Sequence, residues 1–195
     1  MLQGGRDRGV RYYCEADVIR GSRTIVRPVE DRDFPLFHEW MNDPDISWWM
    51  DYEGPFTLDE IERDIEKAHE EGLPFTIEFE SKPIGRIGLN RFRQQSRVAS
   101  TYLFIGDPAA RGRGLATDAM TALLEFAFND RRVRMIDLMV LAENDAAIRT
   151  YKACGFREDG RLRERSWKGD HWMDHLWMSI TAEEFSALKD PSSGS

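Results

Sequence analysis

The most informative segment of this chain is Arg111-Gly112-Arg113-Gly114-Leu115-Ala116. It separates an apolar run, residues 101–105, from a helix-like segment, residues 117–128. The first N–H groups of a helix have no intrahelical partner, and the helix dipole places partial positive charge at that end. Glycine lets a ligand approach the backbone closely, and the two arginines add full positive charge. The stretch therefore predicts a strand, a basic glycine-rich turn and a helix start that together bind a phosphate or diphosphate.

The spacing within this turn distinguishes it from two common phosphate loops. No Gly-Lys-Ser/Thr triplet follows a four-residue gap, and the glycines do not have the spacing of the dinucleotide fingerprint. The pattern Arg-x-x-Gly-x-Ala instead resembles the acyl-CoA diphosphate loop of the GNAT superfamily of N-acetyltransferases. A basic turn before an ordinary helix has the same composition, so the hexapeptide alone leaves both interpretations open.

A second block, residues 140–156, favours the first interpretation. An apolar, strand-like run precedes Asn144, which is a good N-cap residue. Apolar side chains then recur at helical spacing as far as Tyr151, and Gly155 stands where a helix commonly ends in the left-handed conformation. A strand, an Asn, a short helix with a Tyr and then Gly-Phe resemble the other conserved block of the GNAT superfamily.

The two blocks stand in the family's order, and the resemblance covers roughly residues 24–180. It implies the GNAT acyl-CoA N-acyltransferase fold, an α/β protein with a mixed sheet and helices on both faces. Strands are expected at residues 24–28, 75–80, 84–89, 97–105, 135–141, 156–165 and 172–180, and helices at residues 31–42, 57–71, 117–128 and 144–153. Trp48 and Trp49 are expected in a loop after Asp43-Pro44.

The resemblance also implies which residues bind acetyl-CoA. The diphosphate would lie on Arg111, Gly112, Arg113, Gly114, Leu115 and Ala116. The pantetheine arm would lie between the strand that ends with Leu103, Phe104 and Ile105 and the strand that ends at Leu141, and the N–H of Leu103 or Phe104 would stabilise the thioester oxygen. Asn144 matches the family's cofactor-contacting Asn, although a plain N-cap role is equally consistent with its position.

Tyr151 matches the general acid of the family, which protonates the leaving thiolate; the alternative is a core tyrosine on the apolar face of its helix. The general base departs from the family pattern, because Ser100 stands near the position where many relatives carry a strand Glu. A water relay or another carboxylate would have to replace it, with Glu78, Glu80, Asp174 and His175 as candidates. His171 and His175 are too few to predict a metal site, and packing or surface roles are expected for both.

Trp48 and Trp49 are the best indication of the substrate, together with an acidic segment, residues 51–71, that carries nine acidic side chains. With Glu78 they would bind a cationic amine; an exposed helix face and buried core tryptophans are the alternative interpretation. These residues, with residues 42–44, 163–164 and 172–174, resemble the subgroup of ribosomal-protein alanine, spermidine and aminoglycoside 6′-N-acetyltransferases.

The sequence thus predicts direct acetyl transfer from acetyl-CoA to a primary amine, with a small-molecule amine preferred. A protein N-terminus is the alternative substrate, and a non-catalytic acyl-CoA sensor is the alternative from another class. The sensor interpretation is based on the missing strand carboxylate, whereas Tyr151 argues against it.

Length and composition limit the remaining possibilities. The chain has 195 residues and is expected to form one domain, residues 24–189, between a flexible leader, residues 1–23, and a disordered tail, residues 190–195. A net charge of −8 disfavours nucleic acid as a partner, and no run of eighteen apolar residues predicts a membrane span. Only Cys14 and Cys154 are present, which favours a reducing cytoplasm, and exposed edges and aromatic residues make a homodimer plausible.

Overall fold

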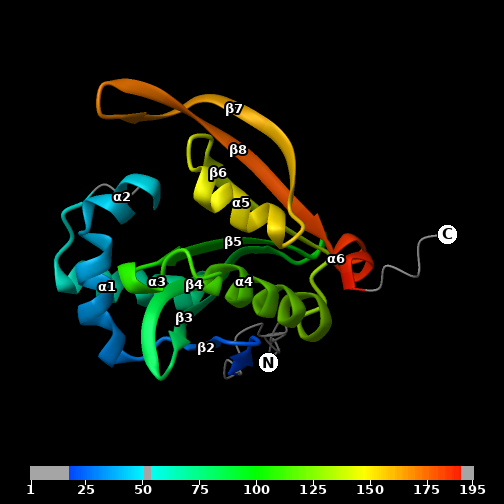
Figure 1. Ribbon diagram of the computed structural model, residues 1–195, viewed down its shortest axis with the longest axis horizontal. Coiled ribbons are helices and arrows are strands. Elements are labelled where there is room, and N and C mark those ends of the chain that lie inside the picture. The colour runs from blue at the N-terminus through cyan, green and yellow to red at the C-terminus, as the bar shows by residue number, and fades with distance from the viewer. Residues whose placement is uncertain (1–17, 51–53, 190–195) are drawn as a thin grey trace, which may run out of the picture.

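One eight-stranded sheet organises the computed structural model, which describes residues 18–50 and 54–189 (Figure 1). The strands lie in the order β1-β2-β3-β4-β5-β6-β8-β7. Their bounds are β1 Ile19–Arg20, β2 Ile25–Pro28, β3 Leu73–Phe79, β4 Lys82–Arg93, β5 Val98–Ile105, β6 Met135–Leu141, β7 Arg157–Lys168 and β8 His171–Thr181. All neighbouring pairs are antiparallel except β5 and β6, so the sheet is mixed, as the sequence predicts.

The parallel pair splits the sheet partway along its length. Pairing between β5 and β6 is limited to three partners, Val98 with Met135, Ala99 with Ile136 and Ser100 with Asp137. Both strands continue well beyond this point, β5 to Ile105 on β4 and β6 to Leu141 on β8. Past Ser100 the facing edges of β5 and β6 are therefore not paired with each other, which opens a fork within the sheet.

Helices cover both faces of the sheet. They are η1 Asp31–Asp33, α1 Phe34–Met41, α2 Pro44–Met50, α3 Leu58–Glu71, η2 Pro108–Ala110, α4 Leu115–Glu125 with its π-helical continuation η3 Phe126–Asp130, α5 Asp145–Ala153 and α6 Ala182–Lys189. Within the described residues, none of these helices combines the length and apolar character that a bilayer crossing needs.

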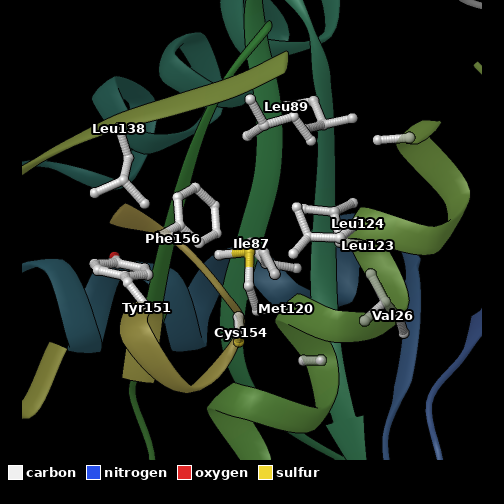
Figure 2. Packing of buried hydrophobic residues seen from close by; sticks show 14 of the residues in the cluster. Val26, Ile87, Leu89, Met120, Leu123, Leu124, Leu138, Tyr151, Cys154 and Phe156 are labelled. Atoms are coloured by element: carbon white, nitrogen blue, oxygen red, sulfur yellow. The ribbon is translucent and has the colours of Figure 1, made fainter. Parts of the chain in front are cut away.

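Strand alternation divides the core between the two faces. One face packs against α4 and α5 in the larger cluster, where Met120 and Leu123 meet Ile87 of β4 and Tyr151 of α5 lies near Phe156 (Figure 2). The other face packs against α1 and α3, where Phe104 of β5 joins a cluster with Trp40. Because successive side chains of a strand point to opposite faces, Phe104 faces α1 while Leu103 packs against the larger cluster.

The predicted elements are largely confirmed, and three were missed. Trp48 and Trp49 lie in the helix α2 rather than in a loop. The C-terminal helix α6 was not expected. Ile19–Arg20 form β1 within the segment expected to be a leader, so the described fold begins before residue 24. The rest of that leader, residues 1–17, and the predicted tail lie outside the described residues.

Candidate active site

The basic turn has the backbone that an anion site needs. Gly112 and Gly114 adopt φ angles of 69° and 76°, in the region that favours glycine, and Gly114 is the N-cap of α4. A Cβ atom placed on either glycine would meet no protein atom within 4 Å. Open space therefore adjoins the first turn of α4, whose N–H groups have no intrahelical partners. This cradle fits a phosphate group.

The arginine side chains of the turn have structural partners of their own. Arg111 donates from Nε to the carbonyl of Ile105 at 3.2 Å and from an Nη to that of Gly106 at 3.3 Å, which ties the turn to the end of β5. The Arg113 guanidinium lies 4.8 Å from the ring centre of Phe79. Binding of an anion here would therefore depend chiefly on the backbone, with positive charge placed around it.

Asp118 of α4 forms hydrogen bonds with the turn that joins β1 and β2. Its carboxylate accepts hydrogen bonds from the backbone N–H groups of Ser22, Arg23 and Thr24, at 2.8 to 3.0 Å, and from the Thr24 hydroxyl at 2.7 Å. Burial alone would raise the pKa of Asp118, but these hydrogen bonds favour the charged form and hold the pKa below its usual value. Arg23 in turn donates to the Arg113 carbonyl at 2.7 Å, so residues 22–24 support the turn.

A cavity of about 510 Å³, here called the loop cavity, runs from this turn past the end of β5 to α5. Its lining includes Asp45, Ile46, Trp49 and Met50 of α2, Leu103, Phe104 and Ile105 of β5, Arg111 and Gly112 of the turn, and Asn144, Ala146, Ala147, Thr150 and Tyr151. The structure thus brings together, around one cavity, the predicted strand residues, part of the predicted turn, Asn144 and Tyr151.

Tyr151 is 6% exposed and packs edge-on against Phe156, with ring centres 5.7 Å apart. Burial raises the pKa of the Tyr151 phenol above its ordinary value, and the neighbouring Cys154 thiol raises it further. The phenol is therefore protonated at neutral pH, as a proton donor must be. Asn144 is the N-cap of α5, where its Oδ1 accepts from the Ala147 N–H at 3.1 Å, and it also lines the loop cavity.

A second cavity of about 400 Å³, here called the α3 cavity, lies against the face that α3 covers. Its lining comes from Met50, from Asp64, Lys67, Ala68 and Glu71 of α3, from Arg86, Leu89, Asn90 and Arg91 of β4, from Ser100, Thr101 and Tyr102 of β5, from Asp137, Leu138 and Met139 of β6, and from Trp177. Met50 belongs to both linings, so both cavities border the end of α2.

Two of the carboxylates predicted as replacement bases, Glu78 and Asp174, line neither cavity. Glu78 accepts a hydrogen bond from Arg27 Nε at 2.8 Å in a largely buried network that also holds Asp33. Asp174 accepts hydrogen bonds from the Glu164 N–H at 2.8 Å and from Arg161 Nε at 2.6 Å. Both bonds lower the pKa of Asp174, and the bond from Glu164 has the larger effect. Neither residue lines the loop cavity or the α3 cavity, so the geometry gives neither of them a role as base.

The predicted substrate residues are likewise dispersed. Trp49 lines the loop cavity and is 39% exposed. Trp48 instead contacts the tip of the β7–β8 hairpin, where the Lys168 ammonium lies 5.7 Å from its ring centre. This contact places the hairpin beside α2, in agreement with the long hairpin that extends toward α2 in Figure 1. The structure does not gather Trp48, Trp49 and Glu78 around one amine site.

Sequence reasoning missed a buried carboxylate at the fork. Asp137 is 2% exposed, and its Oδ1 accepts a 2.5 Å hydrogen bond from the Ser100 hydroxyl. Arg93 donates to its Oδ2 at 2.6 Å. Both Ser100 and Asp137 line the α3 cavity. The available signal was a single acidic residue inside an otherwise apolar strand, which is rare unless the charge is paired or used.

A sheet that forks beside a glycine-lined helix N-terminus, with a buried tyrosine at the same cavity, is the arrangement expected of an acyl-CoA-dependent acyltransferase. Residues 23–157 match the family model described as the acetyltransferase (GNAT) domain. The chain belongs to this family and is an acetyltransferase, for which acetyl-CoA is the acetyl donor.

The relatives agree with this assignment along most of the chain. A spermidine N(1)-acetyltransferase of Vibrio cholerae is 28% identical over 169 residues, which cover 84% of this chain and 96% of that protein. An aminoglycoside N(6′)-acetyltransferase type 1 of Serratia marcescens is 27% identical over 183 residues, covering 80% and 85%. A crystal structure of spermidine N-acetyltransferase from Vibrio cholerae with CoA and spermine superimposes with a TM-score of 0.78 at 26% identity, covering 85% of this chain and 99% of that one.

Proposed function

We propose that the chain transfers the acetyl group of acetyl-CoA directly to the primary amine of a small molecule, without a covalent acyl-enzyme. The observation that carries this proposal is that Met50 borders two cavities, because one is lined by part of the anion turn and by Tyr151 and the other, of about 400 Å³, could hold a second molecule. A thioester held in the loop cavity and an amine held in the α3 cavity would meet where α2 and β5 adjoin. Holding both reactants side by side removes much of the entropic barrier to their reaction.

Binding of the donor is assigned to the predicted residues. The N–H groups of residues 112–116 would hold the diphosphate, and Leu103, Phe104 and Ile105, which line the loop cavity, would border the pantetheine arm along the open edge of β5. Asn144 caps α5 and lines the loop cavity, where it would contact the arm.

The strand geometry favours Leu103 over Phe104 as the donor to the thioester oxygen. In a strand the N–H and C=O of one residue point to the same side, and alternate residues share that side. Gly106 donates to Ile84 of β4, whereas the Ile105 carbonyl accepts from Arg111, away from β4. The backbone N–H of Leu103 therefore points to the same side as the Ile105 carbonyl, toward the fork. The N–H of Phe104 points to the opposite side, toward β4. A donor fixed in this way stabilises the negative charge that develops on the oxygen.

Tyr151 is assigned the role of general acid. Tyr151 lines the loop cavity, and the raised pKa of its phenol would keep the proton in place until a thiolate leaves. The named relatives act on spermidine and on aminoglycosides, which supports a small-molecule amine here. A protein N-terminus is the second candidate substrate, and a reducing cytoplasm is the proposed setting.

Thiol release from acetyl-CoA, measured with a panel of amines, tests the proposal. The panel contains spermidine, an aminoglycoside, an amino sugar and a peptide with a free N-terminal alanine. We expect acetylation of at least one of the small amines, identified by mass spectrometry. Acetylation of the peptide alone would favour the protein substrate. Binding of CoA without acetylation of any amine would favour a non-catalytic sensor and overturn the proposal.

A further inference from the structure

The fork of the sheet contains a pair of polar side chains for which the proposed roles so far give no use. Ser100 and Asp137 are directly opposite each other in the last paired register of β5 and β6, immediately before the strands separate. Ser100 is 8% exposed and Asp137 is 2% exposed, yet both line the α3 cavity. Burying a carboxylate costs several kcal/mol unless it is paired, and Asp137 is paired with Arg93 and Ser100 inside an otherwise apolar strand.

The hydrogen bonds of Ser100 and Asp137 define the direction in which a proton could move between them. The Ser100 hydroxyl donates to Asp137 Oδ1 at 2.5 Å, while Arg93 occupies Oδ2 at 2.6 Å. Since the serine proton points at the carboxylate, the lone pairs of its oxygen are free to accept another proton. A proton that reaches Ser100 can therefore pass on to Asp137 by a one-step relay.

The position of the pair along β5 matches the requirement of the reaction. Alternate residues of a strand share one face. The face of β5 that α1 and α3 cover, which is also the face of the α3 cavity, therefore carries Ser100, Tyr102 and Phe104. Ser100 lies three residues before Leu103, a span of about 10 Å along the strand. An amine beside the thioester, with one or two water molecules, would span this distance.

We infer that Asp137, acting through Ser100, is the base that deprotonates the attacking amine. This inference rests on the proposed acetyl transfer and supplies the carboxylate that β5 itself lacks. Tyr151 then serves only as the acid, on the other side of the fork. The two proton-transfer groups thus approach the reacting atoms from opposite faces of the sheet.

The protons and bonds balance in this scheme. The substrate ammonium gives one proton through water and Ser100 to Asp137, and the freed lone pair forms the new C–N bond to the acetyl carbon. The C–S bond breaks, and its electron pair on sulfur takes the proton of Tyr151. The nitrogen loses its second proton to water, which replaces the proton that Tyr151 gave. Asp137 releases its proton to solvent, so one ammonium yields one amide, one thiol and one free proton.

The test compares Asp137→Asn and Ser100→Ala with wild type, with Ser179→Ala as matched control. Ser179 is also buried and pairs with Asp137 in register from the β8 side, but it lines neither cavity. We expect Asp137→Asn to lower kcat/KM by about 10²-fold near neutral pH, within the range for loss of general base catalysis, and Ser100→Ala by about tenfold. CoA affinity by calorimetry and the control variant's kinetics should match wild type.

The pH profile separates a proton-transfer role from a merely structural one. Without the base the amine must lose its proton to solvent, so kcat/KM of Asp137→Asn should keep rising with pH toward the pKa of the free amine, about 10 for an alkylammonium. The inference would be overturned if both variants were merely less stable and their kcat/KM rose with pH on the acid side of the profile as it does in wild type. If Asp137→Asn does not fold, the Ser100→Ala profile decides. Failure of wild type to acetylate any amine would instead refute the proposed function, and the inference with it.

Discussion

Tyr151 shows how burial shapes the chemistry of a single residue. The ring packs on Phe156 within the larger core cluster, and Tyr151 also lines the loop cavity. The same burial that fixes the ring disfavours the phenolate, so the pKa is raised. A packed core tyrosine and a proton donor are therefore compatible descriptions of one side chain.

Replacement of Tyr151 by Phe should lower kcat by about 10²-fold, since the leaving thiolate loses its proton donor. Because the pKa of Tyr151 is raised, its phenol stays protonated below the ordinary tyrosine pKa of about 10. Deprotonation of Tyr151 should therefore cause no fall in wild-type activity up to about pH 10. Steady-state kinetics across pH and calorimetry with CoA provide the measurement. CoA affinity should be unchanged because the ring remains; a kcat within twofold of wild type would remove Tyr151 from the mechanism.

Asp33 has no proposed part in catalysis, but its buried ion pair with Arg27 should contribute to stability that depends on pH. It is fully buried and accepts from two Nη atoms of Arg27 at 2.7 and 2.8 Å and from the Thr76 hydroxyl at 2.7 Å. Burial alone would raise its pKa, but these hydrogen bonds, together with one from the Glu30 N–H, lower it. A carboxyl whose folded pKa is lowered stabilises the fold above the unfolded pKa of about 3.9. That stabilisation is lost as pH falls through the folded pKa.

Asp33→Asn should therefore reduce the free energy of unfolding at about pH 7 by roughly 3–5 kcal/mol, because the buried Arg27 loses its main partner. The difference from wild type should shrink as pH is lowered below about 4. Urea denaturation at both pH values measures it. The control, Glu30→Gln, removes a half-exposed carboxylate 3.7 Å from Arg27 and should cost no more than about 1 kcal/mol. An equal loss from both variants would contradict the assignment.

Single residues also show where sequence reasoning ends. Asn144 and Tyr151 could be placed on one short helix because their spacing follows helical geometry, which is local, and the family resemblance then implied their roles. Asp137 was not found, because its importance depends on Ser100 in a strand 37 residues away. Glu78 was proposed as a base on the neighbouring strand, but its carboxylate accepts a hydrogen bond from Arg27 of β2. Such pairings depend on strand order, which the sequence does not state.

At the scale of elements, start and stop signals explain both successes and omissions. The Thr57–Glu60 capping box predicts α3 and is observed at its N-terminus. The helix α2 was missed because Asp43-Pro44 was interpreted only as a helix end, although proline is also favoured in the first turn of a helix. The helix α6 was missed although Thr181 and Glu184 exchange the hydrogen bonds of a capping box.

Replacement of Gly114 by Ala tests the turn that begins α4. Its φ of 76° would be strained by about 1–2 kcal/mol in any L-residue, and the added Cβ would enter the open space assigned to the diphosphate. We expect the Kd for CoA, measured by calorimetry, to rise at least about tenfold, which is about 1.4 kcal/mol.

Gly160→Ala is the matched control for this variant, since a Cβ at Gly160 also meets no atom within 4 Å but Gly160 lies on β7 and lacks a positive φ. It should leave CoA affinity and stability unchanged. If Gly114→Ala loses stability but keeps the wild-type Kd, the diphosphate does not bind at this turn.

At the scale of the whole molecule, the distribution of charge matters more than its sum. The net charge of −8 opposes binding of an anion at long range, yet the turn combines helix-dipole charge with Arg111, Arg113 and Arg23. The β5 strand, the turn and α5 all border one cavity, so a single ligand would contact elements from both core faces. Binding of the donor should therefore stabilise the entire fold rather than one loop.

A thermal unfolding series with CoA measures this coupling. A ligand that binds only the folded state adds RT ln(1 + [L]/Kd), about 2.7 kcal/mol at a hundredfold excess over Kd. For a chain of this length each kcal/mol raises Tm by about 2–4 °C, so we expect a rise of roughly 5–11 °C. At the same CoA concentration Asp137→Asn should show the same increment as wild type, because its change affects the amine side alone. Gly114→Ala should show a smaller increment. Equal increments in wild type and Gly114→Ala would place the coenzyme elsewhere on the molecule, and no increment in wild type would mean that the fork does not hold it.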